Sequence, residues 1–162
     1  MSRSNLTTLC YIERGESYLM LHRIKKAQDE NAGKFIGVGG HLEPGESPED
    51  CLRREVLEET GLTLRDWRFR GIVSFLSDEW GDEYMFLYTA TANESDAPLP
   101  DCPEGVLSYI PKSELLSLRL WEGDRIFLRL LLEDAPFFSL KLVYRGEALT
   151  EAVLDGKPID LE

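Results

Sequence analysis

The stretch from Gly40 to Leu62 reads GHLEPGESPEDCLRREVLEETGL and carries the strongest pattern in the chain. Within it, Ser47 can cap a helix, and Pro48 suits the first helical position. The acidic residues that follow Pro48 complement the helix dipole, and Gly61 supplies a stop. The stretch therefore predicts a helix that begins after Ser47 and ends at Gly61, preceded by a glycine-rich loop.

Carboxylates crowd one side of this predicted helix. At about 100° per residue, Glu55, Glu58 and Glu59 project within a sector of roughly 100°, beside an apolar sector that contains Leu52 and Val56. Like charges at these spacings destabilise a helix, and a divalent cation removes the repulsion. Ligands that are all oxygen favour Mg²⁺ or Mn²⁺ over zinc. We therefore expect Mg²⁺ as the cofactor, with Mn²⁺ able to replace it; the alternative is an ordinary solvated helix face.

The composition describes one domain. The chain has 162 residues, 43% of them apolar and 30% charged, which predicts a single domain over residues 1–162. We expect neither a membrane span nor secretion, because no apolar run approaches about 20 residues and the first residues do not resemble a signal peptide. The formal charge of -12 argues against binding to duplex nucleic acid. An anionic substrate would instead be attracted by the bound metal.

The cysteines give no sign of a disulfide framework or a structural zinc site. Cys10, Cys51 and Cys102 are odd in number, widely spaced and form no C-x-x-C pair. A reduced, cytoplasmic location fits this usage best.

The other segments predict a mixed order of strands and helices. Runs rich in aromatic and β-branched residues favour strands, and apolar residues at helical spacing favour a second helix within Trp121–Asp134. Polar or proline-rich connections are expected at Lys25–Lys34 and Asn93–Pro103. The predicted strands, of which the first two and the last two form hairpins, are Leu6–Glu13, Tyr18–Arg23, Arg68–Leu76, Glu83–Ala92, Val106–Ile110, Phe138–Tyr144 and Ala148–Leu154.

The pattern G-x5-E-x7-R-E-U-x-E-E-x-G-U, where U is a bulky aliphatic residue, is complete between Gly40 and Leu62. A chance match in a chain of this length is on the order of one in a million. On these residues the chain resembles the Nudix hydrolase family. The resemblance implies an α/β/α sandwich with a mixed β-sheet, in which residues 40–62 form a loop-helix-loop. This segment would bind divalent metal and hydrolyse a nucleoside diphosphate linked to another moiety.

The resemblance also implies a role for each residue of the box. The expected metal ligands are the carboxylates of Glu55, Glu58 and Glu59 and the carbonyl of Gly39. Arg54 would orient a carboxylate, Glu46 would brace the loop, and Gly40 and Gly61 would keep its shape. Glu104 stands just before a predicted strand, where many members carry a further acidic residue that reaches the metals. Glu55 and Glu104 are the candidates for the general base, and the alternative for Glu104 is a polar loop residue.

Outside the box, the chain resembles the MutT-like branch, which removes pyrophosphate from oxidised purine nucleoside triphosphates such as 8-oxo-dGTP. GKFIGVGG at residues 33–40 and LWEGD at residues 120–124 carry this resemblance. It implies that Trp121 stacks on the purine and that Asp124 hydrogen-bonds its edge. The other residues expected around the nucleotide are Thr8, Arg23, Phe35, Ile36, Gly40 and His41. Ile36 departs from the human-type enzymes, which carry a base-reading Asn there, and His41 stands where relatives often carry Lys.

The sequence thus predicts a Mg²⁺-dependent enzyme, monomeric or homodimeric, that converts an oxidised purine nucleoside triphosphate to the monophosphate and pyrophosphate. Several alternatives stay open. The substrate could be another nucleoside diphosphate derivative, such as an unmodified nucleoside triphosphate, ADP-ribose or a dinucleoside polyphosphate. The chain could be a non-catalytic module that binds a nucleotide. Trp121 could anchor the core, and Asp124 could serve as a first-turn acid of the second helix.

Overall fold

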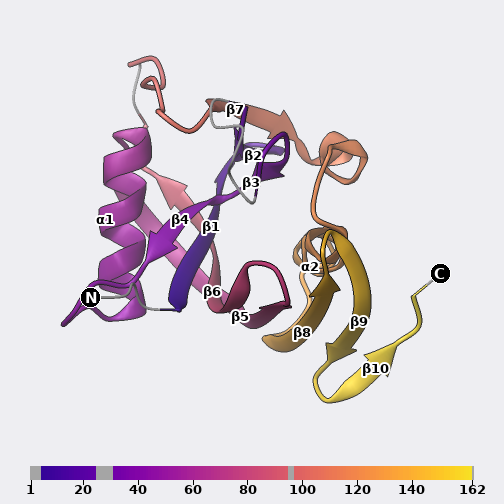
Figure 1. Ribbon diagram of the computed structural model, residues 1–162. Coiled ribbons are helices and arrows are strands. Elements are labelled where there is room, and N and C mark those ends of the chain that lie inside the picture. Colours follow the sequence, from indigo (N-terminus) through magenta and orange to yellow (C-terminus); the bar gives the residue numbers. More distant parts are fainter. Residues whose placement is uncertain (1–4, 25–30, 95–96, 162) are drawn as a thin grey trace.

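The computed structural model describes residues 5–24, 31–94 and 97–161 (Figure 1). The elements follow in the order β1 (Leu6–Arg14), β2 (Ser17–His22), β3 (Phe35–Ile36), β4 (Val38–His41), α1 (Pro48–Thr60), β5 (Leu64–Ser77), β6 (Gly81–Ala92), β7 (Val106–Pro111), the 3₁₀ helix η1 (Lys112–Ser117), α2 (Glu122–Leu132), β8 (Phe138–Arg145), β9 (Ala148–Leu154) and β10 (Lys157–Ile159). None of the helices in these ranges is long and apolar enough to cross a membrane.

The strands form one mixed sheet. Its order is β10-β9-β8-β5-β6-β1-β2-β3, with β4 paired to β1 and β7 paired to β2. β1 runs parallel to β6 and β5 runs parallel to β8, whereas the other strand pairs are antiparallel. Figure 1 shows α1 and α2 on opposite sides of the central strands β1 and β6. The predicted α/β architecture with a mixed sheet is therefore confirmed.

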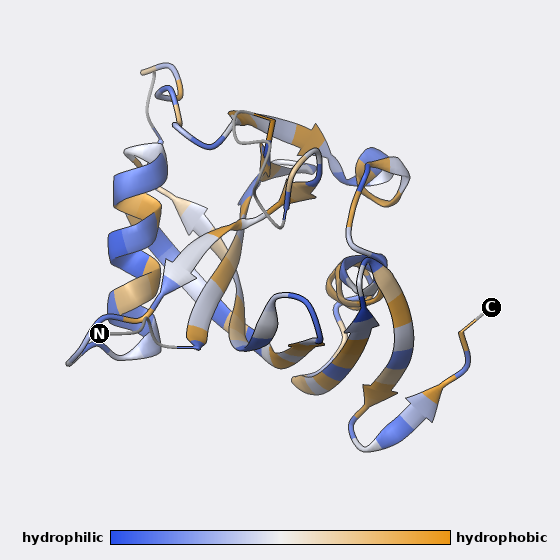
Figure 2. Ribbon diagram, viewed as in Figure 1, coloured by the Kyte–Doolittle hydropathy of each residue, from blue (hydrophilic) through white to orange (hydrophobic). Residues whose placement is uncertain are grey.

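Two apolar clusters fill the two faces of the sheet. Leu52 and Val56 of α1 belong to one cluster, and Phe127 of α2 belongs to the other. Neighbouring residues of β1 enter different clusters, Tyr11 that of α2 and Ile12 that of α1, as the alternation of side chains along a strand requires. The same alternation gives β8 its hydrophobic and hydrophilic bands in Figure 2. Burial on both faces thus fixes the sheet between the helices.

The ends of α1 are set by the residues that the sequence indicated. The Ser47 side chain accepts a hydrogen bond from the Asp50 backbone N–H at 3.1 Å, and the Asp50 carboxylate accepts one from the Ser47 N–H at 3.0 Å. This capping box satisfies amide groups that have no partner within the helix. Gly61 ends the helix in the left-handed conformation, at φ 73°, which a residue without Cβ adopts at no steric cost. The predicted start and end of α1 are confirmed.

Some elements differ from the sequence expectations. β4 occupies most of the glycine-rich stretch before the box, for which no strand was predicted, and it pairs with β1 from Thr7 to Cys10. β3, η1 and β10 were not predicted, and β5 begins four residues before the predicted Arg68. Of the two expected connections, residues 25–30 and 95–96 lie outside the described ranges.

Candidate active site

A cleft of about 980 Å³ is lined by residues of the box, of the sheet and of the start of α2. Its carboxylates come from the box, from β6 and from the segment before β7: Glu43, Glu46, Glu55, Glu59, Glu83 and Glu104. Its aromatic and apolar lining includes Phe75 of β5, Met85 of β6 and Trp121 at the start of α2. Asp124 lies beside this lining, in the first turn of α2. The cleft therefore combines an acidic region with an apolar region that contains one carboxyl group.

Arg54 connects the loop of the box to the helix. Its guanidinium donates to both carboxylate oxygens of Glu46, each at 2.8 Å, and to Glu55 Oε1 at 2.8 Å. It also donates to the His41 carbonyl oxygen at 3.1 Å. Glu46 in turn accepts the Glu43 backbone N–H at 2.8 Å, which closes the loop. The hydrogen bonds from Arg54 lower the pKa of Glu46 to about 2, so this paired carboxylate stays charged well into acid.

Close packing of the loop explains two glycines of the box. A Cβ on Gly40 would lie 2.5 Å from the carboxylate carbon of Glu55, and a Cβ on Gly39 would lie 1.9 Å from the Thr8 carbonyl oxygen. Any side chain at either position would force the loop away from α1 or β1. Gly40 therefore lets the backbone of β4 approach the Glu55 carboxylate of α1, and Gly39 lets it pack against Thr8 of β1.

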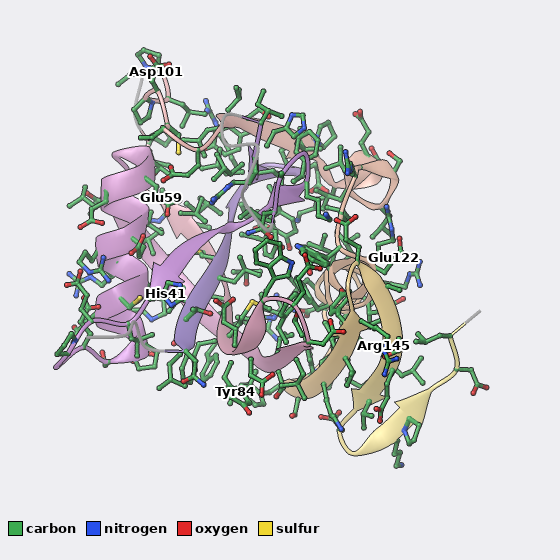
Figure 3. All side chains as sticks on the ribbon, viewed as in Figure 1. His41, Glu59, Tyr84, Asp101, Glu122 and Arg145 are labelled. Carbon is green, nitrogen blue, oxygen red and sulfur yellow. The ribbon has the colours of Figure 1, made fainter. Side chains whose placement is uncertain are left out.

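Glu55, Glu59 and Glu104 form the acidic core of the cleft. Burial raises the pKa of Glu59 well above its usual range, and a hydrogen bond with Glu55 and the charges of Glu55 and Glu104 raise it further. Arg23 acts in the opposite direction. The Cys102 thiol donates to Glu104 Oε2 at 3.1 Å and so helps to place that side chain. Figure 3 shows Glu59 on α1 on the same side of the molecule as His41 on β4.

Carboxylates crowded in this way fit a hard divalent cation, since the ion removes the repulsion that raises the pKa of Glu59. The arrangement is not yet that of a coordination sphere: across residues 5–24, 31–94 and 97–161, no three His, Cys, Asp or Glu side chains converge on one point as metal ligands do. Glu58 is the outlying member. Its side chain is 59% exposed, contacts Arg54 Nη1 at 3.3 Å and is absent from the lining of the cleft.

Trp121 and Asp124 form the other region of the cleft, and both are buried. The Trp121 indole donates its N–H to Asn31 Oδ1 at 2.7 Å, and its ring lies edge to face with Phe75 and Tyr144, at centroid distances of 5.2 and 4.9 Å. Burial raises the pKa of Asp124 to about 8, while the charges of Lys34 and Arg125 oppose that rise. A carboxyl group in this state carries a proton at neutral pH and can donate a hydrogen bond.

The other predicted nucleotide contacts divide into two groups. Residues that line the cleft are Thr8, Arg23, Ile36, Gly40 and His41, and the predicted backbone ligand Gly39 lies there too. Phe35 does not line the cleft, because its ring stacks on His22 at a centroid distance of 4.0 Å. The sequence analysis missed Asn31, Phe75 and Glu83 as lining residues. Alternation along β5 and β6 could have indicated Phe75 and Glu83, whereas no sequence signal marked Asn31.

Comparison with known proteins assigns the family. The NUDIX domain profile matches residues 3–131, which is most of the chain. The chain belongs to the Nudix hydrolase family. Members of this family generally use divalent metal ions, in keeping with the acidic core of the cleft.

Three relatives illustrate the range of this family. The chain is 32% identical to the oxidized purine nucleoside triphosphate hydrolase of Mus musculus, over 85% of each protein. It is 30% identical to the NAD-capped RNA hydrolase NudC of Haemophilus influenzae over 57% of this chain, and that match spans 40% of NudC. Among solved structures, the MutT protein of Bacillus halodurans superposes with a TM-score of 0.77 at 27% identity, covering 94% of this chain and 99% of that protein.

Proposed function

We propose that this Nudix hydrolase is a Mg²⁺-dependent pyrophosphohydrolase that converts a purine nucleoside triphosphate, preferentially an oxidised one, to the monophosphate and pyrophosphate. The observation that carries the proposal is a single cleft lined by Glu55 and Glu59 as well as by Trp121 and Asp124. Carboxylates suit a metal-bound polyphosphate, and an indole beside a buried carboxyl group suits an aromatic base with a polar edge. The name of the mouse relative supports this substrate class.

The box residues have separate roles in the proposed reaction. The proposed metal ligands are the carboxylates of Glu55, Glu58, Glu59 and Glu104 and the carbonyl of Gly39. When bound, the metal supplies charge neutralisation for the polyphosphate and makes a bound water more acidic. Arg54 holds Glu55 in place through its 2.8 Å hydrogen bond. The attacking water passes its proton to a carboxylate, for which Glu55 and Glu104 are the candidates, while the phosphorus–oxygen bond to pyrophosphate breaks.

Base recognition falls to the apolar region of the cleft. Trp121 lines the cleft although it is only 3% exposed, so a purine would contact the part of the indole that faces the cleft, and a protonated Asp124 would donate a hydrogen bond to an acceptor on the base edge. Ile36 also lines the cleft but has no polar group to offer. Of the two positions expected to read the base, Ile36 and Asp124, only Asp124 can make a polar contact, and a buried polar contact is what separates related bases most strongly.

The test is a substrate panel. Pyrophosphate and phosphate release are measured from 8-oxo-dGTP, dGTP, ATP, ADP-ribose and diadenosine polyphosphate, with Mg²⁺ and with EDTA. We expect pyrophosphate from 8-oxo-dGTP, in preference to dGTP, only with the metal. Metal-dependent activity confined to ADP-ribose or the diadenosine compound would overturn the substrate assignment but keep the Nudix chemistry. No activity on any member would overturn the enzyme assignment and favour a nucleotide-binding module.

A further inference from the structure

Lys34, which lies over the Trp121 ring, and its ion-pair partner Glu147 have no part in the reaction described so far. The Lys34 ammonium lies 4.4 Å from the centroid of the Trp121 ring, and the Lys34 side chain is only 6% exposed. Lys34 forms an ion pair with Glu147, which stands in the turn between β8 and β9. Neither residue is among the described residues that line the cleft. Both can therefore act on a ligand only through Trp121 and its surroundings.

The hairpin that carries Glu147 also supports the start of α2. Tyr144 of β8 accepts a hydrogen bond from the Gly123 backbone N–H at 2.7 Å, and its ring packs against Trp121. A Cβ on Gly123 would lie 2.4 Å from a methyl carbon of Leu142, so α2 begins in direct contact with β8. Residues after 131 lie beyond the part of the chain that the NUDIX profile matches. Figure 3 places Arg145, at the end of β8, far from Glu59 and the box.

We propose that Lys34 and Glu147 are positioning residues for base recognition, because their ion pair holds the Lys34 ammonium against the Trp121 ring. The inference rests on the proposed function, since it assumes that Trp121 and Asp124 contact a base. A cation over an indole ring is attracted by the negative face of the π-system and so restrains the ring. A restrained ring loses less conformational freedom when a base stacks on it, which strengthens binding without changing the chemical step.

The ion pair of Lys34 and Glu147 also affects the pKa of Asp124. The charged groups that act on this carboxyl are Lys34 and Arg125 of the same helix. The Asp124 charge in turn raises the pKa of the neighbouring Tyr11 of β1 and Tyr144 of β8. The positive charge of Lys34 lowers the pKa of Asp124, and Glu147 partly compensates that charge. Removing Lys34 and removing Glu147 should therefore shift the titration of Asp124 in opposite directions. A simple loss of packing would give both variants the same sign.

The experiment compares Lys34→Met and Glu147→Gln with Glu151→Gln. Glu151 lies on the same hairpin and pairs with Lys141 at 3.8 Å, so it is a matched carboxylate away from Trp121. All variants carry Trp67→Phe and Trp80→Phe, which leave Trp121 as the single tryptophan. Binding of 8-oxo-dGMP and dGMP without metal is followed by quenching of Trp121 fluorescence between pH 6.5 and 8.5, and kcat and KM are measured with 8-oxo-dGTP and Mg²⁺.

We expect Lys34→Met and Glu147→Gln to weaken nucleotide binding and raise KM by roughly five- to twentyfold, with kcat changed less than about threefold. The midpoint of the pH dependence should rise in Lys34→Met and fall in Glu147→Gln. Glu151→Gln should match its parent. Because Glu147 is exposed, its variant tests the proposal even if Lys34→Met fails to fold.

Binding and KM values in both variants equal to those of Glu151→Gln would overturn the positioning role and leave the proposed function standing. Shifts of the midpoint in the same direction would overturn the electrostatic part of the role. A parent protein that neither binds these monophosphates nor hydrolyses the triphosphate would remove the proposed function, and the inference with it.

Discussion

The two regions of the cleft are built in different ways. Most of the acidic region comes from one continuous segment, in which a capped helix, two glycines and Arg54 bring the carboxylates to the loop, and only Glu83 and Glu104 are added from elsewhere. The apolar region and the side chains packed against it gather Asn31, Phe75, Trp121 and Tyr144, which stand far apart in the chain. The comparison teaches that the region to which we assign the chemistry is encoded mainly locally, whereas the region to which we assign substrate selection depends on the tertiary fold.

The largest effect is expected from removing a charge in the acidic region. Glu59→Gln should lower kcat by about three orders of magnitude at saturating Mg²⁺, equivalent to about 4 kcal/mol of transition-state stabilisation. In the metal-free protein the melting temperature should stay the same or rise, because crowding among Glu55, Glu59 and Glu104 is relieved. Glu58→Gln should also lose orders of magnitude in turnover if its exposed carboxylate joins the metal site. Normal turnover in Glu59→Gln would contradict the metal assignment; Glu151→Gln is the control.

A smaller effect on turnover, with a clear effect on stability, is expected at Arg54. Arg54→Met leaves Glu46 and Glu55 without their partner and should lower the free energy of unfolding by about 2 kcal/mol. Urea denaturation measures this, with Arg53→Met as the neighbouring control. Because the pKa of Glu46 lies near 2, below its usual 4.5, the stabilisation is complete above about pH 4.5 and disappears as the pH falls toward 2. A difference that persists unchanged at pH 2 would contradict this pairing.

The smallest change in turnover is expected at Asp124. Asn resembles the protonated acid, so Asp124→Asn should raise KM less than tenfold at pH 7 and make KM flatter between pH 7 and pH 9. Burial raises the pKa of Asp124 from 3.8 to about 8, so the unfolded chain loses this proton first as the pH rises. Wild-type stability should therefore fall between about pH 4 and pH 8, and that fall should be smaller in the variant. Parallel unfolding curves across this range would show that Asp124 titrates normally.

Sequence reasoning succeeded where the determinants are local. Ser47 and Gly61 mark the ends of α1 because caps act within a few residues, and the periodicity of the helix placed Glu55 and Glu59 on one face. The same periodicity grouped Glu58 with them, but it lies at the edge of the sector, and the structure leaves its side chain largely exposed. The periodicity of a helix gives the direction of each side chain. It does not show how far the neighbouring loop extends over the helix, and so which of these side chains line the cleft.

The elements that the sequence missed depend on distant partners. β4 is rich in glycine and has little strand propensity of its own; it is a strand because β1 offers hydrogen-bonding groups and Gly39 permits close contact with Thr8. Lys34 has no local feature that marks it, since its partners Trp121 and Glu147 lie far along the chain. Such contacts exist only once the sheet has formed.

The parallel pairing of β8 with β5 has a further consequence for any shortened form of the protein. β5 contacts β8 from Gly71 to Ser77, and β8 lies beyond the part of the chain that the NUDIX profile matches. A chain cut near residue 131 would keep the whole box but leave that side of β5 as an open sheet edge. Open edges recruit strands from other molecules. The C-terminal hairpin thus protects the domain against aggregation, and a minimal catalytic fragment should not omit it.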